Sequence, residues 1–108
     1  MYNKAVLIGE ICSKIQTKTI DSGKRVGSFR MVTEDPGKQY HSINCYDKTA
    51  EFADTLSEGD RIFVEGRVVT RSYQDANGTK KYITTVNAAR AARVSNNVPT
   101  TEVDADDF

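Results

Sequence analysis

The sequence contains no tryptophan, a single histidine, only two cysteines and no long apolar run. Cys12 and Cys45 are too few for a disulfide framework and lack the Cys-x-x-Cys spacing of metal or redox sites, so we expect buried, reduced thiols. With His41 as the lone histidine, a zinc site would need carboxylates for most of its ligands. We therefore expect no metal and no cofactor.

Membrane segments are absent as well. The longest apolar stretch near the start covers only residues 5–8, whereas a bilayer-spanning helix needs ~20 residues. No signal-peptide pattern follows Met1. These absences predict a cytoplasmic protein that does not enter a membrane.

The chain also lacks the groupings of side chains that catalysis requires. It has no Ser-His-Asp arrangement, no cysteine with an evident activating partner, and no clustered carboxylates on a loop suited to a metal. The adjacent Glu34 and Asp35 fall in an expected turn. We therefore expect a binding protein rather than an enzyme.

Charge is balanced overall but unevenly distributed. The 15 basic and 15 acidic residues cancel, which at first argues against a nucleic-acid partner. Four of the acids, Glu102, Asp104, Asp106 and Asp107, lie beyond residue 101, where there is no Lys or Arg. Residues 1–101 therefore carry 15 basic groups against 11 acidic ones, a net charge of +4.

The first third of the chain has the patterns of β-strands. Residues 3–11 form an apolar run in which Gly9 is expected to mark a bulge or bend. Residues 15–20 and 26–33 flank a turn at residues 21–24 and predict a hairpin. The second of these strands places Phe29 and Met31 on one face, and Ser28 and Arg30 on the other.

Residues 39–46 alternate strictly between two faces. His41, Ile43 and Cys45 share a face that suits the core or a subunit contact. The opposite face sets two aromatic residues among small polar ones and consists of Tyr40, Ser42, Asn44 and Tyr46. Such a face suits contact with water or a ligand.

The second half of the chain predicts one short helix and a long hairpin. Asp47 is expected to cap a helix over residues 48–58, which Gly59 ends. Residues 61–73 and 80–87 flank an Asn77-Gly78 turn and are expected to pair. Residues 88–94 are ambiguous between strand and helical turn, with strand favoured, and a flexible tail is expected from residue 95 onward.

The order of these elements predicts an all-β fold. The six strand segments and the short helix are best matched by the five-stranded Greek-key OB barrel with a helix between its third and fourth strands, a fold that binds oligonucleotides and oligosaccharides. An immunoglobulin-like sandwich would need about seven strands and no helix. We therefore expect an OB-fold domain over residues 1–94 and an acidic tail over residues 95–108.

Several segments, in order and over nearly the whole chain, resemble bacterial and phage single-stranded DNA-binding proteins. Residues 2–9 resemble the opening strand of that family, and residues 22–26 its next turn and strand. Residues 40–43 and 46–51 are similar to its aromatic-His strand and to the entry into its helix. The most distinctive similarity covers residues 59–67 and 70–75 with Gly78, and is completed by Tyr82, Thr84 and Thr85.

The resemblance implies binding of single-stranded DNA without sequence preference, in DNA replication, recombination and repair. Such proteins stack bases on aromatic side chains and hold phosphates with cations. The expected stacking residues are Tyr40, Tyr46 and Tyr73. The expected phosphate contacts are Arg67, Arg71, Lys80, Lys81, Lys4 and Arg30. Tyr82 is expected in the core, and His41 in packing or a subunit contact.

The resemblance extends to partners. In that family an acidic C-terminal tip ending in Phe docks replication and repair proteins, and Asp104, Asp106, Asp107 and Phe108 match it. The family also implies a homo-oligomer, typically a tetramer, with a dimer as the alternative, associated with the nucleoid.

Three departures from the family pattern keep a second function in view. The chain has no Trp, its loop at residues 34–38 is short, and a short linker leads to a tip without proline before Phe108. The absence of Trp, the short loop and the neutral overall charge favour a protein-interaction or primosome-type adaptor with weak DNA binding, whereas the linker and the tip bear on the reach of the tail. Titration with labelled oligo-dT at two salt concentrations separates the two functions, because an adaptor would show no tight binding.

Overall fold

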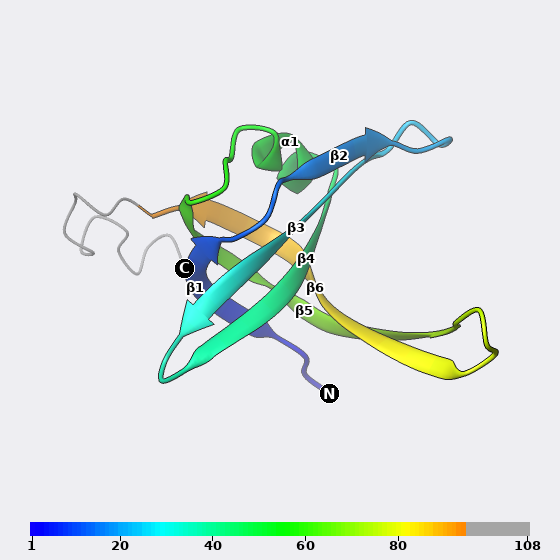
Figure 1. The fold of residues 1–108 in the computed structure, drawn as a ribbon. Coiled ribbons are helices and arrows are strands. Elements are labelled where there is room, and N and C mark those ends of the chain that lie inside the picture. Colours follow the sequence, from blue (N-terminus) through cyan, green and yellow to red (C-terminus); the bar gives the residue numbers. More distant parts are fainter. Residues whose placement is uncertain (95–108) are drawn as a thin grey trace.

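A computed structural model of the protein describes residues 1–94, which form six strands and one helix (Figure 1). The chain folds mostly as β-structure, as predicted. The elements are β1 (Ala5–Ile11), β2 (Gln16–Thr19), β3 (Arg25–Glu34), β4 (Lys38–Tyr46), α1 (Lys48–Ala53), β5 (Arg61–Gln74) and β6 (Lys80–Arg93).

The strands form a single sheet in the order β1-β5-β6-β4-β3-β2, which an additional pairing between β1 and β3 closes into a barrel. β4 and β6 run parallel over a short stretch, and the other pairs are antiparallel. Because β1 and β2 both pair with β3, they together occupy the place of one strand. The predicted five-stranded OB barrel, with its helix between the third and fourth strands, is confirmed.

The core lies inside the barrel and beneath α1. Phe29, Met31, Ile43 and Cys45 are all buried, which confirms the inward faces predicted from the alternation in β3 and β4. Burial raises the pKa of the Cys45 thiol to about 11. Both cysteines are free, and Cys12 is half-buried rather than buried.

The prediction that Gly9 marks a bulge or bend is wrong, although a glycine is needed at this position for another reason. Pairing between β1 and β5 continues through Gly9 without a bulge, and the register shift lies between Glu65 and Gly66 instead. Gly9 is required because a Cβ there would collide with the backbone carbonyl of Val32 on β3. The glycine permits the close approach of strands that closes the barrel.

The helix is shorter than predicted. It ends at Ala53, and the Asp47 side chain makes no cap hydrogen bond. The Thr49 hydroxyl accepts a hydrogen bond from the Tyr46 N–H and donates one to the Tyr46 carbonyl. Beyond the helix the Gly59 N–H donates to the Ile11 carbonyl at 2.8 Å, so contacts with β1 draw this segment away from helical geometry.

β5 and β6 form the longest hairpin, which extends well beyond the barrel (Figure 1). β6 continues to Arg93, so the strand interpretation of residues 88–94 is confirmed. The prediction that Tyr82 lies in the core is wrong, because Tyr82 sits on the projecting part of β6 with 67% of its surface exposed. Among residues 1–94, no buried core residue lies on that projecting part of the hairpin.

Candidate functional site

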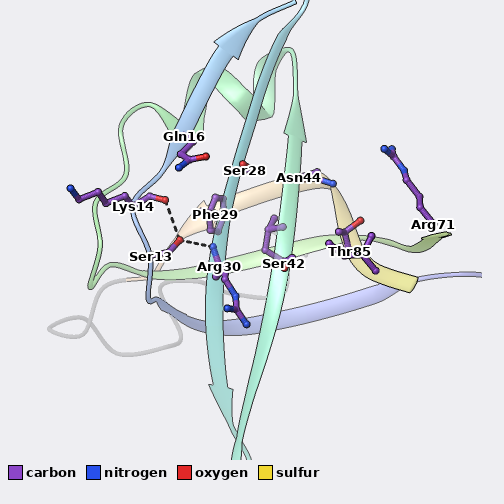
Figure 2. A pocket seen from close by; sticks show the side chains of 12 residues that line it. Ser13, Lys14, Gln16, Ser28, Phe29, Arg30, Ser42, Asn44, Arg71 and Thr85 are labelled. Atoms are coloured by element: carbon purple, nitrogen blue, oxygen red, sulfur yellow. Dashed lines mark hydrogen bonds between the residues drawn. The ribbon is translucent and has the colours of Figure 1, made fainter. Parts of the chain in front are cut away.

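The outer face of β3 and β4 carries a cleft of about 490 Å³. Its sides come from the link between β1 and β2 and from the β5–β6 hairpin. Figure 2 shows Lys14 and Arg71 on opposite sides of the cleft, with Ser28, Ser42 and Asn44 between them. The cleft thus has a cation on either side and small polar side chains between them.

The alternation of β3 and β4 explains the lining of this cleft. The register sets Ser28 beside Asn44 and Arg30 beside Ser42, while the intervening residues point into the core. The link from β1 is fixed by Ser13, whose hydroxyl accepts a hydrogen bond from the Arg30 N–H at 2.8 Å. This contact holds the neighbouring Lys14 at the edge of the cleft.

The cations of the cleft have no acidic partners within residues 1–94. The ion pairs found there join Lys4 and Arg90 to Glu65, Arg25 to Asp54, and Arg93 to Asp60. Lys14, Arg30 and Arg71 take part in none of them. Their charge is therefore available to an anionic ligand.

Two of the three predicted stacking residues are exposed near this cleft. Tyr40 is 56% exposed, and the Arg30 guanidinium carbon lies 5.7 Å from the centre of its ring. Tyr73 is 52% exposed and lies two residues beyond Arg71 on the same face of β5. Neither ring lines the cleft itself, but both are exposed beside cations that do.

Tyr46, Arg67 and Lys4 come together in a different cleft, of about 500 Å³, which also contains Glu65. The Lys4 ammonium lies 2.8 Å from the Glu65 carboxylate, and this hydrogen bond lowers the pKa of Glu65. Lys4 is therefore already paired with an acid, unlike Arg67. Tyr46 is half-buried.

The two clefts adjoin at a pair of amides. Asn44 lines the first cleft and Asn87 the second, and the Asn44 Nδ2 donates to the Asn87 Oδ1 at 3.4 Å. Arg67, Asn87 and Thr85 lie on the same face of the β5–β6 ladder as Arg71. A continuous track thus runs from the hairpin to Tyr46.

The two predicted lysines of β6 face opposite ways. Lys81 pairs with Tyr73 across the ladder and shares its face. Lys80 lies on the other face, where its ammonium is 5.7 Å from the centre of the Tyr82 ring. The structure therefore does not bring Lys80 to the same surface as Arg71.

Sequence reasoning missed several residues of the first cleft. Lys14 lies between two strands, and its position depends on how the barrel closes, which no local pattern reveals. Ile83 and Thr85 had a usable signal, because the Asn77-Gly78 turn sets the register that places them beside Arg71 and Val69. The missed lining residues are Ser13, Lys14, Gln16, Ser28, Phe29, Ile43, Ile83 and Thr85, whereas Ser42 and Asn44 belong to the face that the alternation of residues 39–46 assigned to water or a ligand.

Other expectations fall partly outside the described residues. Asp104, Asp106, Asp107 and Phe108 of the predicted partner-binding tip lie beyond residue 94, and their role stays a prediction. Over residues 1–94 no three His, Cys, Asp or Glu side chains gather as metal ligands. In the same part of the chain, no helix has the length and apolar character needed to cross a bilayer.

Residues 2–94 match the model of the Single-strand binding protein family. A single-stranded DNA-binding protein of Bacteroides thetaiotaomicron is 32% identical over 97 residues, covering 78% of this chain and 60% of the relative. A protein of the same name from Wolinella succinogenes is 29% identical over 92 residues, covering 75% and 57%. The chain thus spans about 60% of the length of these curated relatives.

Solved structures share the fold. The Plasmodium falciparum SSB in complex with ssDNA superimposes with a TM-score of 0.80 at 24% identity, covering 88% of this chain and 97% of that one. The wild-type single-stranded DNA binding protein of Thermus aquaticus gives a TM-score of 0.76 at 21% identity, covering 88% and 41%. These similarities agree with the barrel described above.

Proposed function

The chain belongs to the single-strand binding protein family, and we propose that it binds single-stranded DNA without sequence preference. The main support for this proposal is the first cleft. Its cations form no ion pair within the described chain, and exposed tyrosines lie nearby. The face of the second and third OB strands is where barrels of this kind bind oligonucleotides. In this chain that face is formed by β3 and β4.

Phosphate charge and the flat face of the base are the features common to every nucleotide. Lys14, Arg30 and Arg71 are suited to the phosphates, and Tyr40 and Tyr73 to the bases. The track over Asn44 and Asn87 would carry the strand onward to Tyr46 and Arg67. Lys81 would contact phosphate beside Tyr73, whereas Lys4 would first have to leave Glu65.

The proposal is of binding without catalysis, in DNA replication, recombination and repair. It places the protein in the cytoplasm with the nucleoid, as the family resemblance implies. The adaptor function predicts no tight DNA binding, so the same binding measurement decides between the two.

The test replaces Tyr40, Tyr46 and Tyr73 together by alanine. Stacking is worth ~1 to 3 kcal/mol per base, so affinity for oligo-dT should fall by at least about 100-fold. Fluorescence anisotropy with labelled oligo-dT measures the affinity. A triple phenylalanine variant is the matched control, because it keeps the aromatic rings and removes only the hydroxyls.

Circular dichroism melting must show that the alanine variant is folded. If a folded triple-alanine protein binds oligo-dT as tightly as the wild type, stacking on these tyrosines does not hold the strand. Absence of oligo-dT binding by the wild-type protein would favour the adaptor instead.

The structure also supports a homo-oligomer. Within the described residues, the edge of β1 that faces away from β5 pairs with β3 only at Glu10 and Ile11. Val6 and Ile8 on this strand are exposed, although they are apolar. An apolar strand with an open edge is a surface for pairing with another chain. We propose a second copy of the protein as that partner, in a tetramer or a dimer, and a monomer mass by light scattering would contradict this.

A further inference from the structure

The β5–β6 hairpin carries one tyrosine on each of its faces. The ladder pairs Tyr73 with Lys81 and Ser72 with Tyr82. Paired residues share a face and adjacent residues take opposite faces. Tyr73 therefore lies on the face that borders the first cleft, and Tyr82 lies on the reverse face.

The hairpin is nearly free of negative charge on both faces. Between residues 66 and 94 the only acid is Asp75. Its carboxylate accepts hydrogen bonds from the backbone N–H groups of Asn77 and Thr79, both at 2.9 Å, and so holds the turn. The arms carry Arg67, Arg71, Lys80 and Lys81, and none of them forms an ion pair within residues 1–94.

The reverse face repeats the chemistry of the first. Tyr82 is more exposed than Tyr73, and the Lys80 ammonium lies near its ring. Next to it, the hydroxyls of Thr70 and Thr84 share a hydrogen bond of 2.9 Å. An exposed aromatic ring, a cation without an acidic neighbour on its face and small hydroxyls are the groups that hold a single strand.

The reverse face is also continuous with the proposed binding surface. Val68 and Thr84 line a cleft of about 310 Å³ together with Tyr40, which stands on β4. This cleft and the first one share Ser42 and Thr85. A strand that leaves the first cleft near Tyr40 therefore meets the reverse face of the hairpin next.

We propose that the Tyr82 face of the β5–β6 hairpin is a second contact for single-stranded DNA, so that a long strand contacts both faces of the hairpin. The inference rests on the proposed DNA-binding function. Charge complementarity favours DNA over a protein as the occupant. The projecting part of this face, around Lys80, Tyr82 and Thr84, offers one aromatic ring but no contiguous apolar patch of the kind that forms the centre of a protein interface.

The projection of the hairpin gives both faces room for DNA. Figure 1 shows β5 and β6 running past the barrel, with no other described segment packed over their outer ends. A short strand would fill the first cleft alone. Only a longer strand would reach around to Tyr82.

The experiment compares Tyr82→Ala with Tyr73→Ala on two lengths of labelled oligo-dT. One length is about 8 nucleotides, within the range that one OB fold covers, and the other is about 30, roughly twice the upper end of that range. Tyr82→Ala should weaken binding of the long oligonucleotide by about 5-fold or more and leave the short one unchanged. Tyr73→Ala should weaken both.

Two companion variants separate stacking from other roles of this face. Tyr82→Phe should bind both lengths as the wild type does, because it keeps the ring. Lys80→Ala should reduce the slope of log affinity against log salt by about 0.7 for the long oligonucleotide only.

The outcomes are distinct from those of the proposed function. If Tyr82→Ala weakens neither length, or weakens both equally, the second contact does not exist as proposed, even though the wild type binds DNA. If Tyr82→Ala instead changes the mass of the protein in light scattering and leaves DNA binding unchanged, the Tyr82 face joins protomers. That result would also overturn the inference. If the wild-type protein binds neither length of oligo-dT, the proposed function itself is wrong.

Discussion

The cations on the surface of this protein fall into two groups, paired and open. The paired cations, Lys4, Arg25, Arg90 and Arg93, lie against acids on the barrel wall and near α1. The open cations make no ion pair in the part of the chain that the structure describes. They follow the first cleft and the β5–β6 hairpin, and include Lys14, Arg30, Arg67, Arg71, Lys80 and Lys81.

The difference shows that the position of the acids, rather than net charge, defines the candidate binding surface. A sequence with a formal net charge of zero still presents an uncompensated positive track, because its acids stand elsewhere. Exposed ion pairs add little to stability. The main consequence of where the acids lie is therefore that the cations of the first cleft are left without an ion-pair partner among residues 1–94.

The largest expected effect comes from giving an open cation an acidic partner. Ile83 is exposed and stands directly opposite Arg71 across the ladder, so Ile83→Glu sets a carboxylate beside that guanidinium. One phosphate-binding charge is then neutralised and one repulsive charge is added. The slope of log affinity against log salt should fall by about 1.4 for oligo-dT, measured by anisotropy at several salt concentrations.

Two matched variants define this test. Ile83→Gln changes the same side chain without charge and should keep the wild-type slope. Arg25→Gln removes a paired cation and should keep it too, because Arg25 is already bound to Asp54. Equal slopes for the Glu and Gln variants at position 83 would show that Arg71 does not contact phosphate.

The fold could be predicted from the sequence because its signals are local. Alternation in β3 and β4 identified the buried Phe29, Met31, Ile43 and Cys45, and the Asn77-Gly78 turn identified the long hairpin. The barrel closure was not local. Gly9 reads as a bulge until β3 is known to pass against it.

The site could be predicted only in part, because a binding surface depends on which strands become neighbours. Tyr82 has the pattern of a core residue, yet it stands on a part of β6 that has no core beneath it. Nothing in the sequence distinguishes Lys4 from Arg71 as a phosphate contact. Only the fold shows that Lys4 is paired with Glu65. Lys14 carries no pattern at all and reaches the cleft through barrel closure.

The smallest expected effect concerns the acids that pair with cations, Asp54 and Glu65. The hydrogen bond from Arg25 lowers the pKa of Asp54, and that from Lys4 lowers the pKa of Glu65. Such pairs stabilise the fold fully above the ordinary carboxyl pKa values, and the stabilisation is lost as pH falls through the lowered ones. Urea midpoints measured from about pH 5 to about pH 1 should therefore decline less steeply for Asp54→Asn than for the wild type. The variant should bind oligo-dT at neutral pH with the wild-type salt slope, because the Asp54 carboxylate pairs with Arg25 and with none of the open cations. An unchanged acid decline would mean that the Arg25–Asp54 pair does not persist in solution, and an altered salt slope would mean that the paired and open cations are not separate groups.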